Sequence, residues 1–420
     1  MKRIKFGIRL SFYTNIWKVL CLFWQTDHSV HSDLASYSGF QAVSDLATLK
    51  ASTLLIRSVI DVVRSRWYYN QSIMKIAIDT RRIGKKLSGI GRYTECLLSG
   101  LSLINGPNQY LRLDDATAPY ELYSLKNQLM LPEILNNQRV DLYHSPYFTI
   151  PFLMRKSLPC VVTLHDLIPW KFPHFTPKAK KTKLRWLFRH IMTAVIKRAD
   201  RIIAVSHTTA RDIEECFPVD SSKIRVVYNG IDPVFFDAHN ENKGQYILYV
   251  GRSEPYKNIV AALNAYLRAC QIYKIPHRFI ITGELDSRYT EAQAIVERLN
   301  LEKRITITGH IQSEELIKAY RGADLLLMPS RYEGFGYPVI EAMACGVPVI
   351  ISRAPALVEV AGGHAVSVNP DDTEDFAEAI HNILTDSALS RRLSTEGREH
   401  AGKFTIEKMA RETLRVYEEC

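Results

Sequence analysis

From Met74 onward, hydrophobic and polar positions alternate in a regular order along the chain. Short apolar runs rich in β-branched residues predict strands, and longer segments with apolar residues three and four positions apart predict the helices between them. One series has strands at 75–79, 140–145, 160–166, 201–206 and 223–229, with helices at 90–103, 177–198 and 207–216. A second series has strands at 246–251, 278–283, 304–309, 324–330 and 347–352, with helices at 258–274, 289–299, 313–321, 336–345 and 372–384.

This alternation predicts an α/β protein, because apolar strands separated by helices form parallel sheets that carry helices on both faces. Two series predict two Rossmann-like, doubly wound domains that face a cleft. We place the N-terminal domain at 74–240 and the C-terminal domain at 241–402. Residues 403–420 predict a final helix with no strand after it, which crosses back to the first domain.

Residues 1–73 have a different pattern and form an N-terminal extension. An apolar stretch at 9–24 follows basic residues, as in a signal peptide, but Asn15 and Lys18 interrupt it and no small-residue cleavage site follows. We interpret the extension as an appendage to a domain that starts at Met74, and the alternative is a membrane-associating segment. No run of eighteen apolar residues predicts a transmembrane helix anywhere in the chain.

Cysteine spacing and charge narrow the class of protein. The seven cysteines are scattered, with no CxxC pair and no histidine cluster at metal spacing, which indicates a reducing, cytoplasmic compartment and argues against a zinc site. The net charge of +10 is concentrated at 171–201, where ten Lys and Arg residues stand against the single acid Asp200. Such a basic segment indicates an anionic partner or surface.

The predicted helix 177–198 lies within this basic segment. Its apolar residues repeat at helical spacing, and most of its basic residues lie off that stripe (apolar Leu184, Leu187, Phe188, Ile191 and Val195; basic Lys180, Lys181, Lys183, Arg185 and Arg189). One interpretation is a helix that lies on an anionic membrane, and the other is a stripe packed on the core with solvated charges. No DNA- or RNA-binding motif accompanies the basic residues, so we predict no nucleic-acid partner.

Ligands of doubly wound sheets bind at the carboxyl ends of the strands, so the residues that follow each strand are the candidate site. Arg252 and Lys257 follow the strand 246–251 and precede a helix. Two cations beside a helix N-terminus suit a diphosphate.

The segment EGFGYPVIEAMACG at 333–346 follows the strand 324–330. Its two glycines, at 334 and 336, allow the backbone to approach a ligand closely, and a proline then fits the first turn of a helix. Glu333 stands at the strand–helix junction, where it faces the cleft, and Glu341 lies inside the helix. Carboxylates accept hydrogen bonds from sugar hydroxyls, so both acids are candidates for binding a ring or a ribose.

The predicted N-terminal domain contributes two further candidates. His165 and Asp166 end the strand 160–166, where the first domain would face the second. Gly89 and Gly91 lie in a loop before a helix, a pattern that suits a phosphate contact but lacks the full dinucleotide fingerprint.

Taken together, these segments resemble the retaining glycosyltransferases of family 4, which have the GT-B architecture. The matching stretches occur in the family's order over 74–420, and they are GIGRYTECLL, HSPYF, VVTLHDLIP, AVSHTTARDI, VVYNGID, YVGRSEPYKN, GADLLLMPSRYEGFGYPVIEAMACGVPVI and FTIEKMARETLRVYEE. Within the family, GIGRY with HDLIP looks most like bacterial mannosyltransferases of lipopolysaccharide or exopolysaccharide assembly.

The resemblance implies a nucleotide-sugar donor bound mainly by the C-terminal domain. Arg252 and Lys257 would then hold the diphosphate. Glu341 would take the ribose hydroxyls, and Glu333 would take hydroxyls of the donor sugar near its C3.

The resemblance also implies backbone contacts and a contribution from the N-terminal domain. The amides of Phe335 and Gly336 would approach the sugar and the phosphate, Gly89 would touch the diphosphate, and His165 would contact the sugar beside the reacting carbon. The family often has two adjacent glycines in the first loop, and here Ser88 precedes Gly89.

The implied reaction is transfer of a hexose with retained configuration, by front-face attack in which the leaving phosphate acts as base. Cations and helix N-termini would stabilise the leaving group, so the resemblance implies no metal, and no DxD-like motif stands at a strand end. We expect GDP-mannose as donor, a glycan or lipid-linked glycan as acceptor, no cofactor besides the substrate, and a cytoplasmic enzyme that lies peripherally on the inner face of the cytoplasmic membrane. The alternatives are a UDP-sugar donor (glucose, galactose or GlcNAc), a nucleotide-sugar 2-epimerase, against which the two glutamates argue, and a non-catalytic paralogue.

Overall fold

The computed structural model describes residues 73–84, 89–104, 106–173, 185–237, 244–283, 288–298, 301 and 303–420. Residues Ile73–Cys420 form one compact unit. The predicted N-terminal extension, up to Ser72, lies outside the described residues, as do residues 177–184 of the predicted basic helix. No helix in the described part of the chain has the length and apolar character needed to cross a membrane.

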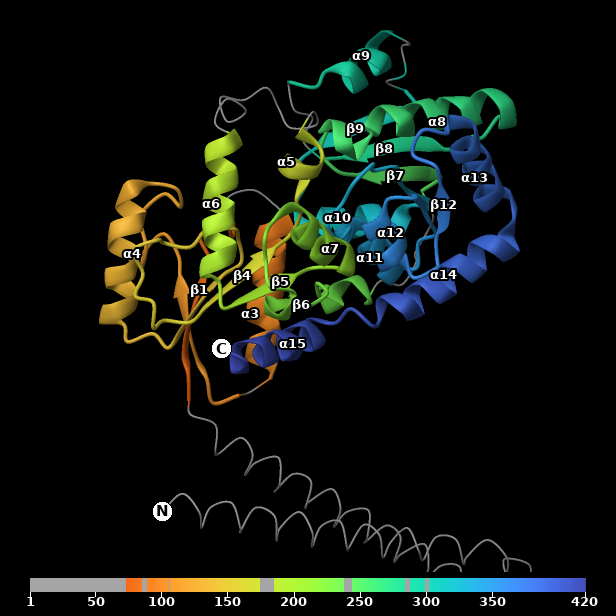
Figure 1. Cartoon of the computed structure of the whole chain (residues 1–420). Helices are drawn as coiled ribbons and strands as arrows, with labels where there is room; N and C mark the ends of the chain where they lie inside the picture. Colours follow the sequence, from red (N-terminus) through yellow and green to blue (C-terminus); the bar gives the residue numbers. More distant parts are fainter. Residues whose placement is uncertain are drawn as a thin grey trace, which may run out of the picture. The chain divides into compact units, whose positions relative to one another are not determined.

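The N-terminal half of this unit is built on a six-stranded parallel sheet with the order β2-β1-β3-β4-β5-β6 (Figure 1). Every residue of β4 is buried, as expected for a parallel strand that is covered on both faces. The strands of this half are β1 (Lys75–Asp79), β2 (Gln109–Leu113), β3 (Leu142–Ser145), β4 (Cys160–Leu164), β5 (Arg201–Ala204) and β6 (Ile224–Val226), and its helices are α3 (Gly89–Leu103), α4 (Leu125–Asn137), α5 (Ile168–Lys171), α6 (Arg185–Arg198) and α7 (His207–Cys216).

The C-terminal half has a second six-stranded parallel sheet, with the order β12-β11-β10-β7-β8-β9. The chain leaves the middle strand β7 in one direction and returns to its other side with β10, so the strand order reverses between β7 and β10. A doubly wound sheet binds its ligand at this kind of switch point. The strands of this half are β7 (Tyr246–Val250), β8 (Arg278–Thr282), β9 (Ile305–Gly309), β10 (Leu325–Met328), β11 (Val349–Ser352) and β12 (Val366–Val368), and its helices are α8 (Ile259–Tyr273), α9 (Glu291–Arg298), α10 (Ser313–Gly322), α11 (Tyr337–Ala344), α12 (Pro355–Ala361), α13 (Thr373–Thr385) and α14 (Ser387–Ala401).

The last helix, α15 (Ile406–Glu418), returns to the N-terminal half and packs along α3, as Figure 1 shows. Gly100 makes this approach close, because a side chain there would overlap the backbone of Ile406. The end of α15 is held by Arg201, whose Nε donates to Glu419 at 3.0 Å, and by the Tyr417 hydroxyl, which lies 2.7 Å from Nδ1 of His144. The predicted crossing helix is therefore confirmed.

The structure also contains elements that the hydrophobic pattern did not predict, namely β2, β12, α4, α5, α12 and α14. Strand β2 lies at the edge of its sheet and buries only Leu113 fully, and β12 has three residues. Helix α4 contains Pro132, and α14 buries few side chains, so neither shows a clear apolar stripe. The two-domain α/β fold was predicted correctly, whereas the domain boundaries at 240 and 402 stay predictions.

The described part of the basic helix, α6, places its apolar stripe against the core. Val195 is buried, and the ring of Phe188 stacks on Trp170 with centroids 5.2 Å apart. The exposed side chains of α6 include Arg189 and Lys197. For the described residues, packing therefore accounts for the stripe.

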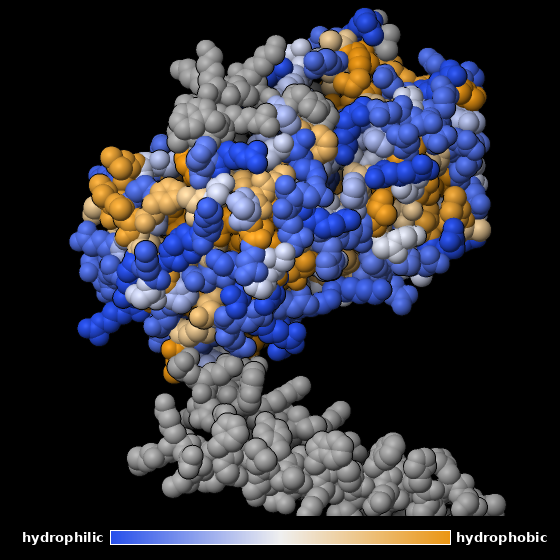
Figure 2. All heavy atoms as spheres, in the orientation of Figure 1, coloured by the Kyte–Doolittle hydropathy of each residue, from blue (hydrophilic) through white to orange (hydrophobic). Residues whose placement is uncertain are grey.

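Exposed hydrophobic residues gather on the side of the molecule that carries α4, where Figure 2 shows a patch of hydrophobic surface. Leu125 and Leu129 stand one turn apart on α4, and Phe152 and Leu153 lie in the loop between β3 and β4. The amide of Phe152 donates to the side chain of Gln128 at 2.9 Å, which ties this loop to the helix. The apolar surface thus belongs to the N-terminal half.

Candidate active site

Lys257 and Glu333 meet at the switch point of the second sheet. Lys257 ends a short 3₁₀ turn after β7, and Glu333 follows β10. The Lys257 Nζ donates to Glu333 Oε1 at 2.8 Å, and both side chains are largely buried. The structure therefore brings together two predicted site residues that stand 76 positions apart.

Arg252 lies in the same loop as Lys257, but its side chain is more exposed. Its guanidinium forms an ion pair with Glu254 at 3.3 Å, and more than half of the side chain is open to solvent. A cation in this position can reach an anion that enters the switch point from solvent.

The glycine turn between β10 and α11 brings the two halves of the protein into contact. A side chain at Gly334 would overlap the carbonyl oxygen of His165, so only glycine fits there. The carbonyl of Gly334 accepts hydrogen bonds from the hydroxyls of Ser206, at 2.6 Å, and Thr209, at 3.1 Å. Gly336 is the N-cap residue of α11, and its φ of +105° is a conformation that L-residues rarely adopt.

Phe335, between these glycines, contributes its backbone to the turn and its ring to the core. The ring packs at 5.5 Å from Tyr337 and at 5.9 Å from Phe404. The predicted contact with the donor therefore concerns only the amide of Phe335.

His165 stands at the carboxyl end of β4, where its imidazole is held by the N-terminal half. Its Nε2 donates to the carbonyl of Pro146 at 3.0 Å, and its ring meets that of Tyr93 edge-on at 4.7 Å. Burial lowers the pKa of His165 to about 4, although the bond to the Pro146 carbonyl opposes this shift. The imidazole is therefore neutral at pH 7, with Nδ1 as an acceptor.

Asp166 adds a carboxyl group to this cluster. Burial raises its pKa to about 6. The bond from the amide of Ile168 opposes this shift, the negative charge of Glu333 adds to it, and the positive charge of Lys257 opposes it. Asp166 therefore lies within electrostatic reach of the Lys257–Glu333 pair, across the boundary between the two halves.

Glu341 lies on α11 with only 1% of its surface exposed. Its Oε1 accepts a hydrogen bond from Nη1 of Arg92, and its Oε2 accepts one from the hydroxyl of Tyr320 at 2.9 Å. Burial is the largest single influence on the pKa of Arg92 and lowers it. The negative charge of Glu341, its hydrogen bond and the nearby Tyr320 together outweigh burial, so the pKa of Arg92 lies above its ordinary value.

The sequence patterns did not identify Arg92 as a site residue. It lies in the first turn of α3, where the helix dipole disfavours a cation. That unfavourable position was the available signal that Arg92 has an anionic partner elsewhere in the fold.

Gly89 is the first residue of α3, and residues 85–88 before it lie outside the described part. A side chain at Gly89 would meet no atom of the described residues within 4 Å. The contact of Gly89 with a diphosphate stays a prediction.

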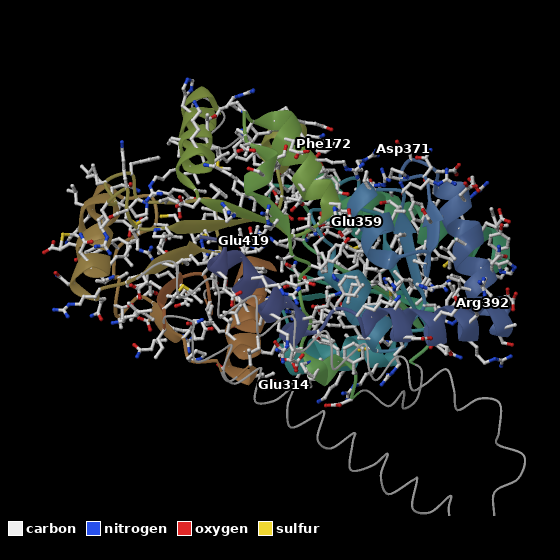
Figure 3. All side chains as sticks on the ribbon, turned by 60° about the horizontal axis from the view of Figure 1, so that its bottom comes forward. Phe172, Glu314, Glu359, Asp371, Arg392 and Glu419 are labelled. Atoms are coloured by element: carbon white, nitrogen blue, oxygen red, sulfur yellow. The ribbon has the colours of Figure 1, made fainter. Side chains whose placement is uncertain are left out.

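Glu359 of α12 links the C-terminal half to α7 of the N-terminal half. It accepts hydrogen bonds from the amides of His207, at 2.6 Å, and Thr208, at 2.9 Å, and so caps the N-terminus of α7. Figure 3 labels Glu359 where helices of the two halves meet.

No group of three or more His, Cys, Asp or Glu side chains able to hold a metal ion occurs in the ranges that the structure describes.

Comparison with known proteins decides the family. A family model described as Glycosyltransferase Family 4 matches residues 111–235, and one described as Glycosyl transferases group 1 matches residues 232–400. The chain is 33% identical over 267 residues to O-antigen chain mannosyltransferase RfbU of Salmonella typhimurium. This aligned region covers 63% of this chain and 71% of that protein. The chain belongs to glycosyltransferase family 4.

Other relatives of this family 4 glycosyltransferase agree in sequence and in fold. It is 27% identical over 397 residues to O-antigen chain mannosyltransferase B of Escherichia coli, covering 82% of this chain and 99% of that protein. Its fold resembles sucrose-phosphate synthase from Thermosynechococcus elongatus, with a TM-score of 0.65, 22% identity and coverage of 82% and 98% of the two chains. It also resembles WaaG, a glycosyltransferase involved in lipopolysaccharide biosynthesis, with a TM-score of 0.64, 14% identity and coverage of 81% and 99%.

These comparisons confirm the predicted family, the GT-B fold and the assignment as a glycosyltransferase. The roles of individual site residues stay predictions.

Proposed function

We propose that this glycosyltransferase transfers mannose from GDP-mannose to a glycan or lipid-linked glycan in cell-surface polysaccharide assembly, with retention of configuration. The observation that carries the proposal is the Lys257–Glu333 pair at the β7/β10 switch point. The names of the O-antigen mannosyltransferases that the chain resembles support mannose as the sugar.

The charges at the switch point match the two parts of a sugar diphosphate. Lys257 has three N–H donors, so it can bind a phosphate oxygen while it still donates to Glu333. Arg252 adds a second cation at the open side. Glu333 accepts hydroxyls of the sugar, and the turn at Phe335 and Gly336 directs the N-terminus of α11 toward the donor.

In the proposed reaction, the bond between the anomeric carbon and the phosphate oxygen breaks first. Positive charge then develops on the sugar and negative charge on the leaving diphosphate, which Lys257 and Arg252 stabilise without a metal ion. The acceptor hydroxyl attacks from the same face and passes its proton to the leaving phosphate oxygen. A neutral His165 suits this step, because it adds no positive charge beside a cationic sugar.

A lipid-linked acceptor and a peripheral position on the cytoplasmic membrane are supported by two surface features of the N-terminal half. Arg189 and Lys197 are exposed on α6, and Leu125 and Leu129 are exposed on α4. A basic and partly apolar surface is attracted to anionic lipid.

The alternative is the same reaction with a UDP-sugar. It is supported by the similar fold of HepE from Anabaena in complex with UDP-glucose, with a TM-score of 0.64, 16% identity and coverage of 83% and 100% of the two chains.

A thermal-shift panel tests the proposal, because a ligand that binds the native state raises the melting temperature. GDP-mannose, UDP-glucose, ADP-glucose and dTDP-glucose are compared, each with and without EDTA. We expect the largest shift with GDP-mannose, unchanged by EDTA. A shift confined to the UDP-sugar favours the alternative, and the absence of any shift contradicts the proposal.

A further inference from the structure

Arg92 joins the two halves of the enzyme at the carboxylate that we assign to the ribose. It belongs to α3 of the N-terminal half, and Glu341 belongs to α11 of the C-terminal half, 249 positions later. The guanidinium of Arg92 also lies over the ring of Phe235, 5.7 Å from its centroid. The segment between the two sheets, which contains Phe235, therefore takes part in the same contact.

Protein donors occupy both oxygens of Glu341. Arg92 donates to one, the hydroxyl of Tyr320 donates to the other, and the side chain is almost fully buried. Each oxygen could accept a second hydrogen bond, but only 1% of Glu341 is exposed, so a ribose reaches this carboxylate only if one of the covering side chains moves. Tyr320 is fully buried on the neighbouring helix of the same half, whereas Arg92 comes from the other half and is partly exposed, so Arg92 is the group that can move.

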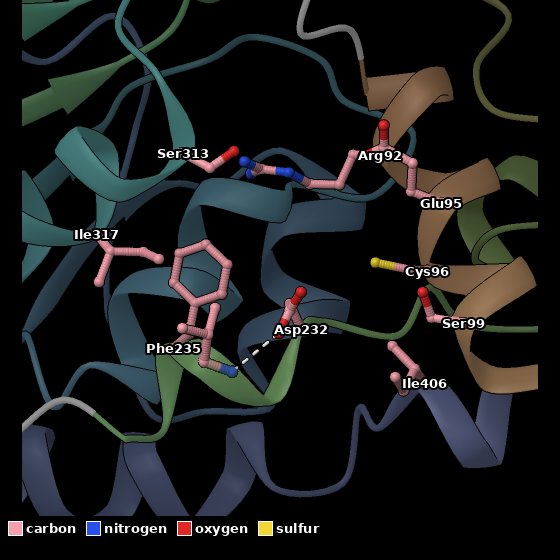
Figure 4. A pocket seen from close by; sticks show the side chains of 10 residues that line it. Arg92, Glu95, Cys96, Ser99, Asp232, Phe235, Ser313, Ile317 and Ile406 are labelled. Carbon is pink, nitrogen blue, oxygen red and sulfur yellow. Dashed lines mark hydrogen bonds between the residues drawn. The ribbon is translucent and has the colours of Figure 1, made fainter. Parts of the chain in front are cut away.

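A cavity of 90 Å³ adjoins Arg92 (Figure 4), and neither Lys257 nor Glu333 is among the residues that line it. It lies among α3, α10, α15 and the segment between the sheets, and Figure 4 shows Arg92 extending across it toward Ser313. A space of this size holds several water molecules and therefore also a planar guanidinium.

The lining of this cavity suits a cation that has left its first partner. Arginine keeps its charge at all relevant pH values, so a displaced Arg92 needs another anion. Glu95 stands one turn further along α3, within side-chain reach of Arg92. Asp232 also lines the cavity and uses one oxygen, Oδ1, to cap the amide of Val234 at 3.0 Å.

We propose that Arg92 is a positioning residue for the donor: its guanidinium holds Glu341, and it yields this carboxylate to the ribose hydroxyls by moving into the cavity toward Glu95 and Asp232. The inference rests on the proposed role of Glu341 in binding ribose. The exchange connects ribose binding in the C-terminal half to α3, whose first residue, Gly89, borders the proposed diphosphate site. Arg92 then couples ribose binding at Glu341 of the C-terminal half to the predicted diphosphate contact of Gly89 in the N-terminal half.

Calorimetric titration of the full chain with GDP and with 2′,3′-dideoxy-GDP tests this exchange, because only GDP has the ribose hydroxyls that compete with Arg92. In Arg92→Met, we expect GDP to bind about fivefold tighter or more, since Glu341 no longer has to be released. The affinity for the dideoxy nucleotide should stay within about twofold of the wild-type value. Arg268→Met is the matched control, because this arginine pairs with Glu374 on the surface of α8 and both affinities should be unchanged.

Glu95→Gln tests the second position of the guanidinium in a variant that changes only an exposed side chain. We expect it to weaken GDP binding about two- to threefold and to leave the dideoxy nucleotide unaffected, because the displaced Arg92 loses one partner. This variant keeps the inference testable if Arg92→Met does not fold.

Three results would overturn the inference. Equal changes for both nucleotides in Arg92→Met would show a purely structural role, and weaker binding of GDP alone would show that Arg92 supports Glu341 throughout. Equal binding of GDP and dideoxy-GDP by the wild type would remove the ribose role of Glu341, and the inference with it. If the wild type binds neither GDP nor UDP, the proposed function itself fails. If it binds only UDP, the same test is made with UDP and 2′,3′-dideoxy-UDP.

Discussion

Replacing Lys257 with alanine tests the proposed chemistry most directly. The side chain is held at 2.8 Å from Glu333 at the switch point, and little of either side chain is exposed. Removing it takes away one of the two cations that we assign to the leaving diphosphate and leaves Glu333 without this partner.

The size of the effect follows from the burial of this pair. A unit charge about 4 Å from another, at the effective dielectric of a partly buried site, interacts by about 4 kcal/mol. Desolvation and the existing bond to Glu333 offset part of this, so a charged hydrogen bond contributes about 1.5–3 kcal/mol. At about 1.4 kcal/mol for each factor of ten, kcat/KM should fall roughly 10- to 150-fold.

The assay measures the rate of GDP-mannose hydrolysis in the absence of acceptor, monitored as the GDP that is released. The Kd of GDP is measured alongside. The fall should appear more in kcat than in KM, because the charge on the leaving oxygen develops in the transition state. Lys257→Arg should retain more of the rate, since it preserves the cation. Lys408→Ala, an exposed lysine on α15, is the control for the substitution itself.

A rate for Lys257→Ala within about threefold of the wild-type rate would refute the assignment, because it would correspond to well under 1 kcal/mol of transition-state stabilisation. A similar loss in Lys408→Ala would show instead that the assay responds to net charge.

Three further predictions address other parts of the site. Glu341→Gln should raise the KM for GDP-mannose at least about tenfold, because the ribose loses a charged acceptor, and an unchanged KM would count against that role. Gly334→Ala should lower the melting temperature by about 5 °C or more, since a side chain there overlaps the backbone of His165, whereas Gly106→Ala, with open space around it, should leave the melting temperature unchanged. Burial raises the folded-state pKa of Asp166 from its ordinary value of 3.8 to about 6. The folded state therefore binds more protons than the unfolded state over this range, and the charged carboxyl destabilises it increasingly as pH rises. The melting temperature of Asp166→Asn should therefore rise relative to that of the wild type between pH 4 and pH 6.5. A difference that does not change with pH would show that Asp166 does not titrate in this range. The opposing titration of His165 is common to both proteins and cancels in the comparison.

Local pattern was enough to predict the architecture. A strand such as β4, buried at every position, must be apolar throughout, and the return of such runs between helices indicates parallel sheets. The same pattern placed Lys257 and Glu333 at the carboxyl ends of strands, which is why they could be predicted as site residues. Elements such as α14, which bury few side chains, leave little periodicity to read and were missed.

The partners of these residues depend on the tertiary structure. Arg92 and Glu341 stand 249 positions apart, and Gly334 meets His165 only because two sheets dock with their loops opposed. Periodicity records which face of an element is buried, but it carries no information on which distant side chain lies against that face. The sequence thus specifies two sheets and the chemistry at their strand ends. The strand order of the second sheet, which sets β10 beside β7, brings Lys257 to Glu333, and the docking of the halves decides that Arg92 covers the carboxylate assigned to the ribose.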